Sequence, residues 1–129
     1  MSQLCRGRIV WVELFDPQGR NRKCRPAVIV TPDADIKADG EVWVVAISTQ
    51  VSEAPADVQV ELPWDRRGHP RTKLKERCAA VCTWMENVPV ASIQEFAGIV
   101  PGRQLLDILT HLKPPEPSAE AGAPEGPSS

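Results

Sequence analysis

Short apolar runs of β-type residues dominate this sequence and limit what it can fold into. Five segments are rich in valine, isoleucine and other strand-forming residues and are separated by turn signals: 7–16, 25–31, 41–50, 57–62 and 78–88. In the fourth segment apolar and polar residues alternate strictly, as in a strand with one buried face. We predict five strands, with a further short strand or turn around 90–96.

Only the end of the apolar region has a helical pattern. In residues 101–112 apolar side chains recur at helical spacing, and Pro114 and Pro115 stop the pattern. We expect one helix face, belonging to the core or to a dimer interface, to carry Leu105, Leu106, Ile108, Leu109 and Leu112. Residues 114–129 contain no core-forming side chains, which predicts a domain over 1–113 and a disordered Pro/Ala/Glu/Ser tail over 114–129.

The chain of 129 residues fits one domain. Short strands with one terminal helix predict a mostly β fold, a small, curled, mostly antiparallel barrel. No apolar run approaches the roughly 18 residues of a membrane-spanning helix, and the N-terminus lacks the architecture of a signal peptide. We therefore expect a cytoplasmic protein with no membrane contact.

Positive charge is concentrated in two short segments. The tail carries three acids and no base, so residues 1–113 hold fifteen bases and fourteen acids. Ten of those bases lie within 20–25 and 66–77. If the fold joins the two segments, they form a basic groove that suits a polyanion, whereas apart they are two solvated loops.

Cysteine spacing and missing motifs exclude several kinds of chemistry. The four cysteines, Cys5, Cys24, Cys78 and Cys82, form no C-x-x-C knuckle, so we expect buried free thiols, with a zinc site as the alternative. No phosphate-binding glycine loop, dinucleotide fingerprint, zinc-protease motif or serine-hydrolase elbow occurs. We predict no cofactor and no metal.

The remaining candidates are polar groups at strand ends. Arg25 opens the second segment, and Ser48, Thr49 and Gln50 close the third. If these strands pair antiparallel, Arg25 lies beside Ser48 or Thr49, and a guanidinium with a hydroxyl is a suitable clamp for a phosphate. The alternative is a surface arginine beside an ordinary strand end.

A family resemblance favours the phosphate clamp. The ordered segments "GRIVWVELFDPQG", "CRPAVIVT" and "VAISTQ" resemble the opening of the MazF/PemK toxin family, whose members carry a strand ending in Asp-Pro, a polar loop, Arg-Pro-Ala, and a strand end with hydroxyl residues and glutamine. The segments "RTKLKERCAAVC" and "GIVPGRQLLDIL" resemble later family segments. The likeness covers nearly all of residues 6–112.

The resemblance implies an SH3-like barrel that forms a homodimer, and the toxin of a type II toxin–antitoxin pair. Such a toxin is an endoribonuclease that cleaves single-stranded RNA without metal. The RNA's own 2′-OH attacks, leaving a 2′,3′-cyclic phosphate and a 5′-OH, and a cognate antitoxin neutralises the protein. The family's catalytic arginine falls on Arg25 and its catalytic threonine on Ser48, with Thr49 beside it.

The basic loops are then expected to bind RNA. The RNA-binding candidates are Arg20, Arg22, Lys23, Gln50, His69, Arg71, Lys73 and Lys75. Trp64 either stacks on a base or plugs the end of the barrel.

Three departures from the family pattern affect the chemistry. Arg8 replaces the usual aspartate, and Lys73 stands where glycine is usual. The loop "QGRNRKC" lacks the glutamate that is the proposed base in some members. His69 is a candidate base, because its ordinary pKa lies near neutrality.

Other functions fit the same pattern. One is a non-catalytic inhibitor similar to CcdB, which binds DNA gyrase, and another is a relative that has lost catalysis and only binds RNA or protein. A third is a small SH3-like interaction module. Replacing Arg25 by alanine separates the ribonuclease from the gyrase binder, because a ribonuclease should lose cleavage and keep its fold, whereas a gyrase binder should be barely affected.

Overall fold

The computed structural model describes residues 4–15, 20, 22–49 and 59–112. Its elements in chain order are the strands β1 (Arg8–Leu14) and β2 (Lys23–Ile29), the short helix η1 (Asp33–Asp35), the strands β3 (Glu41–Ser48), β4 (Gln59–Leu62) and β5 (Cys78–Pro89), the short helix η4 (Val90–Ser92), the strand β6 (Ile93–Ile99) and the helix α1 (Gly102–His111). Gln50, residues 57–58 of the fourth predicted strand and the tail over 114–129 lie outside the described residues.

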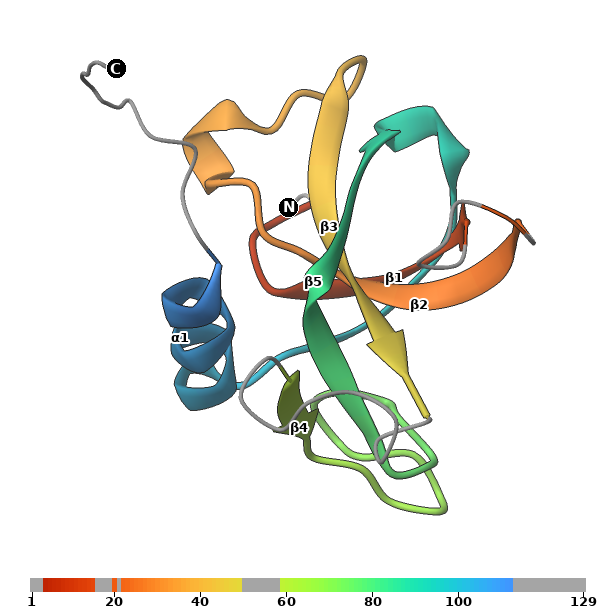
Figure 1. The fold of residues 1–129 in the computed structure, drawn as a ribbon, viewed down its shortest axis with the longest axis vertical. Helices are drawn as coiled ribbons and strands as arrows, with labels where there is room; N and C mark the ends of the chain where they lie inside the picture. Colours follow the sequence, from red (N-terminus) through yellow and green to blue (C-terminus); the bar gives the residue numbers. More distant parts are fainter. Residues whose placement is uncertain (1–3, 16–19, 21, 50–58, 113–129) are drawn as a thin grey trace.

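Six strands form one antiparallel sheet in the order β4-β5-β3-β2-β1-β6 (Figure 1). The predicted mostly β fold with a C-terminal helix is confirmed. The sheet curls, but its ladder is not closed into a barrel within the described residues, so the predicted closure is wrong. The end of β6 meets a loop instead of a strand, because the Ile99 N–H donates to the Arg71 carbonyl at 2.7 Å.

A large bulge bends the longest strand. Val45 pairs with Met85, but Ile47, two residues further along β3, pairs with Ala80. One residue of β3 therefore faces four of β5, which forces β5 to turn sharply. The bulge lets the two halves of β5 serve different surfaces: the first half pairs with β4, and the second carries Trp84 across the sheet.

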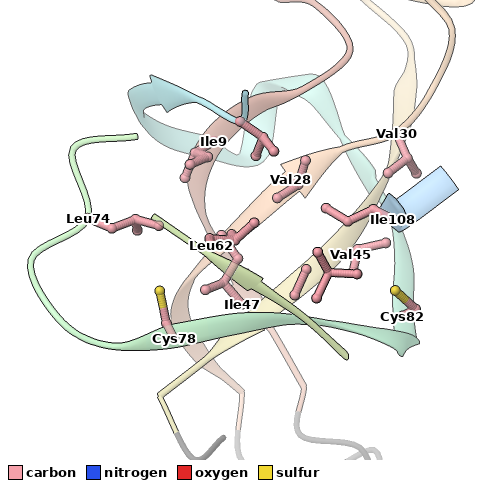
Figure 2. Close-up of a cluster of buried hydrophobic side chains, with 13 residues drawn as sticks. Ile9, Val28, Val30, Val45, Ile47, Leu62, Leu74, Cys78, Cys82 and Ile108 are labelled. Atoms are coloured by element: carbon pink, nitrogen blue, oxygen red, sulfur yellow. The ribbon is translucent and has the colours of Figure 1, made fainter. Parts of the chain in front are cut away.

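The alternation of side chains along the strands builds two apolar clusters. The helix-side core lies under α1 and β4 and includes the side chains labelled in Figure 2: Ile9, Val28, Val30, Val45, Ile47, Leu62, Leu74, Cys78, Cys82 and Ile108. The far-side core uses the intervening positions, Val10, Val12, Leu14, Ala27, Ile29, Val42, Val44, Ala46 and Val88. Both faces of the central strands are therefore buried, as their nearly continuous apolar runs require.

The helix buries a narrower face than expected. Ile108 is fully buried, and Leu105, Leu109 and Leu112 pack against the helix-side core. Leu106 is 65% exposed and does not pack on the core of this chain. At about 100° per residue, Leu106 lies about 160° around the helix from the fully buried Ile108.

The strand that the sequence indicated least clearly is β6. It runs over seven residues, where only a short strand or turn around 90–96 was expected. Its alternation is weak, because Ile93 and Phe96 pack on the far-side core while Ala97 packs on the helix side. Two register shifts against β1 accompany this change of face.

Candidate functional site

The start of β2 and the end of β3 come together as the sequence suggested. The two strands pair antiparallel, with Ala27 opposite Ala46. Continuing this register by two residues sets Arg25 opposite Ser48. Both side chains are half-buried, at the end of the sheet and on the face of the far-side core.

Trp84 holds the guanidinium of Arg25. The Cζ atom of Arg25 lies 5.0 Å from the centroid of the Trp84 ring, within the range of a cation–π contact. The Nε1–H of Trp84 donates to the Phe15 carbonyl at 3.0 Å, which fixes the ring. Sequence reasoning missed Trp84, because it sits within an apolar strand; only the bulge in β5 brings it to Arg25.

An acid accompanies this tryptophan. Glu86 lies two residues further along β5, on the same face as Trp84 by strand alternation. Its Oε2 accepts a hydrogen bond from the Phe15 N–H at 3.1 Å. The sequence prediction found no acid in the loop before Arg25, and Glu86 brings a carboxylate to this end of the sheet from a distant segment.

A pocket of about 350 Å³ opens on the opposite face of β2. Its floor is a row across four strands, in which Trp11 pairs with Glu95 on one side and Pro26 on the other, and Ile47 follows on β3. Thr49 stands at its edge. The remaining lining residues come from the loop before β5, from β5 and from β6: Lys73, Leu74, Lys75, Glu76, Cys78 and Ala97.

Hydrogen bonds between side chains and the backbone shape the loop over 63–77. The Nδ1 atom of His69 accepts from the N–H groups of Arg71 and Thr72 at 3.1 and 3.3 Å. The fully buried Thr72 donates its hydroxyl to the Pro63 carbonyl at 2.8 Å. Since Nδ1 accepts these two N–H groups, neutral His69 carries its proton on Nε2. It then has no free ring nitrogen that could take a proton from a substrate.

Gly98 clamps the same loop to the sheet. A Cβ at this position would overlap the carbonyl oxygen of Arg71 and lie 2.5 Å from the carbonyl carbon of Thr72. Only glycine permits this approach of two backbones. The contact fixes the position of Lys73, which has a φ of 63° and so adopts the left-handed conformation that glycine adopts most easily.

The predicted site residues thus divide between two faces. Arg25 and Ser48 form what we call the arginine face, which also includes Trp84 and Glu86. Thr49, Lys73 and Lys75 belong to the pocket face. The faces meet at the ends of β2 and β3, because adjacent residues of a strand point to opposite sides.

The other predicted RNA-binding residues surround these faces. Arg22 forms an ion pair with Glu13 at 2.9 Å and lies over the Phe15 ring at 5.6 Å. Arg20, Lys23 and Arg71 are exposed. Trp64 is 42% exposed, so it is not a buried plug.

The thiol in the pocket is not activated. Burial and the nearby Glu76 and Glu61 raise the pKa of Cys78 to about 11, so the thiol is protonated at neutral pH and is a poor nucleophile. Burial also raises the pKa of Cys82. Cys5 is partly exposed and Cys24 exposed, so the expectation of burial holds for two of the four thiols. Within the described ranges, no group of three or more His, Cys, Asp or Glu residues could hold a metal ion.

Solved structures share this fold. The sheet and helix are similar to an endoribonuclease from a mycobacterial species, with a TM-score of 0.63, 17% identity, and coverage of 87% of this chain and 89% of that chain. MazF from Deinococcus radiodurans gives a TM-score of 0.65 at 19% identity, over 84% and 92% of the two chains. A MazE–MazF structure from the same organism gives 0.63 at 16% identity, over 87% and 94%.

The fold is therefore that of a MazF-type protein. The family model for the PemK-like, MazF-like toxin of type II toxin–antitoxin systems matches residues 5–114, and the chain belongs to that family. No curated protein sequence matches the chain. In the part of the chain that the structure describes, no helix has the length and apolarity to cross a bilayer.

Proposed function

We propose that this toxin is an endoribonuclease that cleaves single-stranded RNA, such as mRNA in the cytoplasm, without a metal ion. The observation that carries the proposal is the cation–π contact that holds the Arg25 guanidinium over Trp84, at the end of β2 that the antiparallel register directs toward Ser48. The family membership and the mycobacterial endoribonuclease of the same fold support it.

The proposed reaction is an internal transesterification. The 2′-oxygen of one nucleotide forms a bond to the adjacent phosphorus while the bond from phosphorus to the 5′-oxygen breaks. The 2′-OH loses its proton to a base, and the departing 5′-oxygen gains one. The products are a 2′,3′-cyclic phosphate and a 5′-OH end.

Arg25 stabilises the charge that develops on the non-bridging phosphate oxygens. Its planar guanidinium offers N–H groups in a fixed fork that matches two phosphate oxygens. The contact with Trp84 and the partial burial orient this fork before RNA binds, which is what electrostatic stabilisation of a transition state requires. Ser48, on the same face, supplies a hydroxyl donor. Arg25 acts through its charge, since an arginine guanidinium is not deprotonated in proteins.

Glu86 is our candidate for the proton acceptor. It is a carboxylate on the same face of β5 as Trp84, and its Oε2 is held by the Phe15 N–H. His69 lacks this capacity while its Nδ1 caps the loop. Glu86 would thus replace the glutamate that "QGRNRKC" lacks.

Two protein partners complete the proposal. We propose a homodimer, as the family resemblance implies. We also propose a cognate antitoxin, whose acidic segment covers the basic loops and competes with RNA for the same charges. The solved MazE–MazF structure of the same fold supports the existence of an antitoxin partner.

The test uses purified protein and a long single-stranded RNA in EDTA, with mapping of the new ends. Arg25→Ala should lower the cleavage rate about 10²- to 10³-fold, because it removes a preorganised donor. Arg103→Ala, which changes an exposed arginine at the start of α1, is the matched control and should cleave as the wild type does.

Discrete cuts with 5′-OH ends that disappear in Arg25→Ala would support the proposal, provided that circular dichroism shows the variant folded. A folded wild-type protein that cuts no RNA would refute it. In that case binding to DNA gyrase, or binding to RNA without cleavage, becomes the function to test.

A further inference from the structure

The pocket on the other side of β2 combines groups that match one kind of ligand. Aromatic, acidic and basic side chains line it together. Trp11 and Glu95 are directly paired across β1 and β6, and the loop over 63–77 contributes Lys73, Lys75 and Glu76. Apolar walls are provided by Pro26, Ile47 and Leu74. This mixture of an apolar slot with a few charged groups is typical of a site for one small planar molecule.

The backbone at Lys73 provides an independent observation. Among the described residues, Lys73 is the one non-glycine residue with a positive φ, at 63°. A side chain at such a position strains the backbone, and strain of this kind concentrates at functional sites. The loop holds the residue in place through the Lys73 N–H, which donates to the His69 carbonyl at 2.9 Å. The hydrogen bond and the left-handed conformation thus fix the backbone of Lys73 beside the pocket that this residue lines.

We propose that this pocket binds one guanine base of the RNA, and that Glu95 and Lys73 determine this specificity. The proposal rests on the proposed function, because it assigns the RNA sequence that the toxin reads. A volume of about 350 Å³ lies at the lower end of the roughly 300–1,000 Å³ of ligand pockets, which suits a base rather than a larger ligand.

Guanine is the base whose edges fit these charges. A carboxylate accepts from its adjacent N1–H and N2–H groups, while an ammonium donates to its O6 or N7 acceptors. Adenine lacks the N1–H and would present an acceptor to Glu95. The pyrimidines lack a pair of adjacent donors and fill less of the slot. Trp11 adds a ring against which the base can pack.

The surrounding charge favours RNA over a side chain of a protein partner. The segment 66–77, which forms one wall, carries six basic residues and one acidic residue. A nucleotide whose base enters the pocket has its phosphates near the basic residues of this segment, of which Lys75 also lines the pocket and Arg71 is exposed. Phosphate contacts position such a ligand, and the base contacts specify it.

The test measures binding by fluorescence anisotropy with short 2′-O-methyl oligoribonucleotides, which lack the nucleophile and cannot be cleaved. One guanosine among uridines is compared with inosine, which lacks the N2 amino group, and with adenosine. Wild type should bind the guanosine probe at least tenfold more tightly than either, as expected for loss of a bidentate contact. Glu95→Ala should lose most of the preference over inosine.

Lys73→Gly is expected to change stability and RNA affinity in opposite directions. It should raise the melting temperature, because glycine adopts this φ without strain, and it should weaken the binding of the guanosine probe about tenfold. The control is Lys37→Ala, which removes the same charge ahead of β3, whereas the pocket lies beyond its other end. It should leave both the affinity and the preference unchanged.

Equal affinity of the wild type for the three probes, or an unchanged preference in Glu95→Ala, would overturn the proposal. So would an unchanged affinity of the pocket variants for every probe, which would assign the pocket to a side chain of a protein partner. Cleavage failure is a separate result: guanine preference with no cleavage in EDTA refutes the catalytic proposal alone.

Discussion

The two faces at the end of β2 are built in different ways. The arginine face depends on strand pairing: Arg25 and Ser48 are set by the register of β2 and β3, and Trp84 by a bulge in β5. The pocket face depends on a loop, whose residues are placed by turn hydrogen bonds and by one contact with Gly98. We infer that catalysis is assigned to the more rigid construction and recognition to the more variable one.

Replacing Gly98 by alanine should disrupt the pocket face, and it is the substitution from which we expect the largest effect. The new Cβ would overlap the Arg71 carbonyl, so the loop or β6 must move, at a cost of about 3 kcal/mol of unfolding free energy. Urea denaturation measures this loss. Gly102→Ala is the matched control, since nothing lies within 4 Å of its added Cβ, and it should be neutral or slightly stabilising. Equal stability of the two variants would contradict the clamp.

Replacing Glu86 by glutamine tests the arginine face without touching the loop. Glutamine keeps an oxygen for the Phe15 N–H but cannot accept a proton, so the cleavage rate should fall about 10²-fold while guanine preference stays the same. Single-turnover cleavage and anisotropy measure the two quantities. An unchanged rate would show that the proton leaves by another route.

A smaller effect is expected at alkaline pH on the pocket face. The pKa of Cys78 is about 11 in the folded chain and 9.0 for an ordinary thiol, so above pH 9 the unfolded state releases a proton that the folded state keeps. The contribution is fully present below pH 9 and is lost as pH rises to 11. The loss is about 2 kcal/mol.

The measurement compares unfolding free energies of wild type and Cys78→Ala from pH 8 to pH 11. All other ionisable side chains are the same in the two proteins, so the difference between the two curves isolates the Cys78 thiol. Parallel curves would mean that the Cys78 thiol ionises as freely in the folded chain as in the unfolded one.

The arginine face was largely predictable because its information is local. The Arg-Pro start of β2 and the hydroxyl end of β3 are strand termini, and the antiparallel pairing of successive strands brings such termini together. Trp84 and Glu86 were not predictable, since a bulge is a property of two paired strands and leaves no period in one sequence.

Of the pocket face, the sequence predicted Thr49 and two basic residues. Lys73 and Lys75 were identified from charge clustering, but Trp11 and Glu95 were assigned to no site. They meet because β1 pairs with β6, two strands separated by most of the chain. Contacts of this kind depend on the pairing of strands that are distant in the sequence and not on neighbouring residues.

The sequence by itself determined β1 to β5, the terminal helix and the family, because side-chain alternation and ordered motifs are carried by residues close together in the chain. Only the tertiary structure decided that the sheet stays open, that Leu106 faces solvent, and that the site residues divide between two faces of β2. The physical reason is that these outcomes depend on packing between distant segments, where Gly98 can meet Arg71 and Trp84 can meet Arg25.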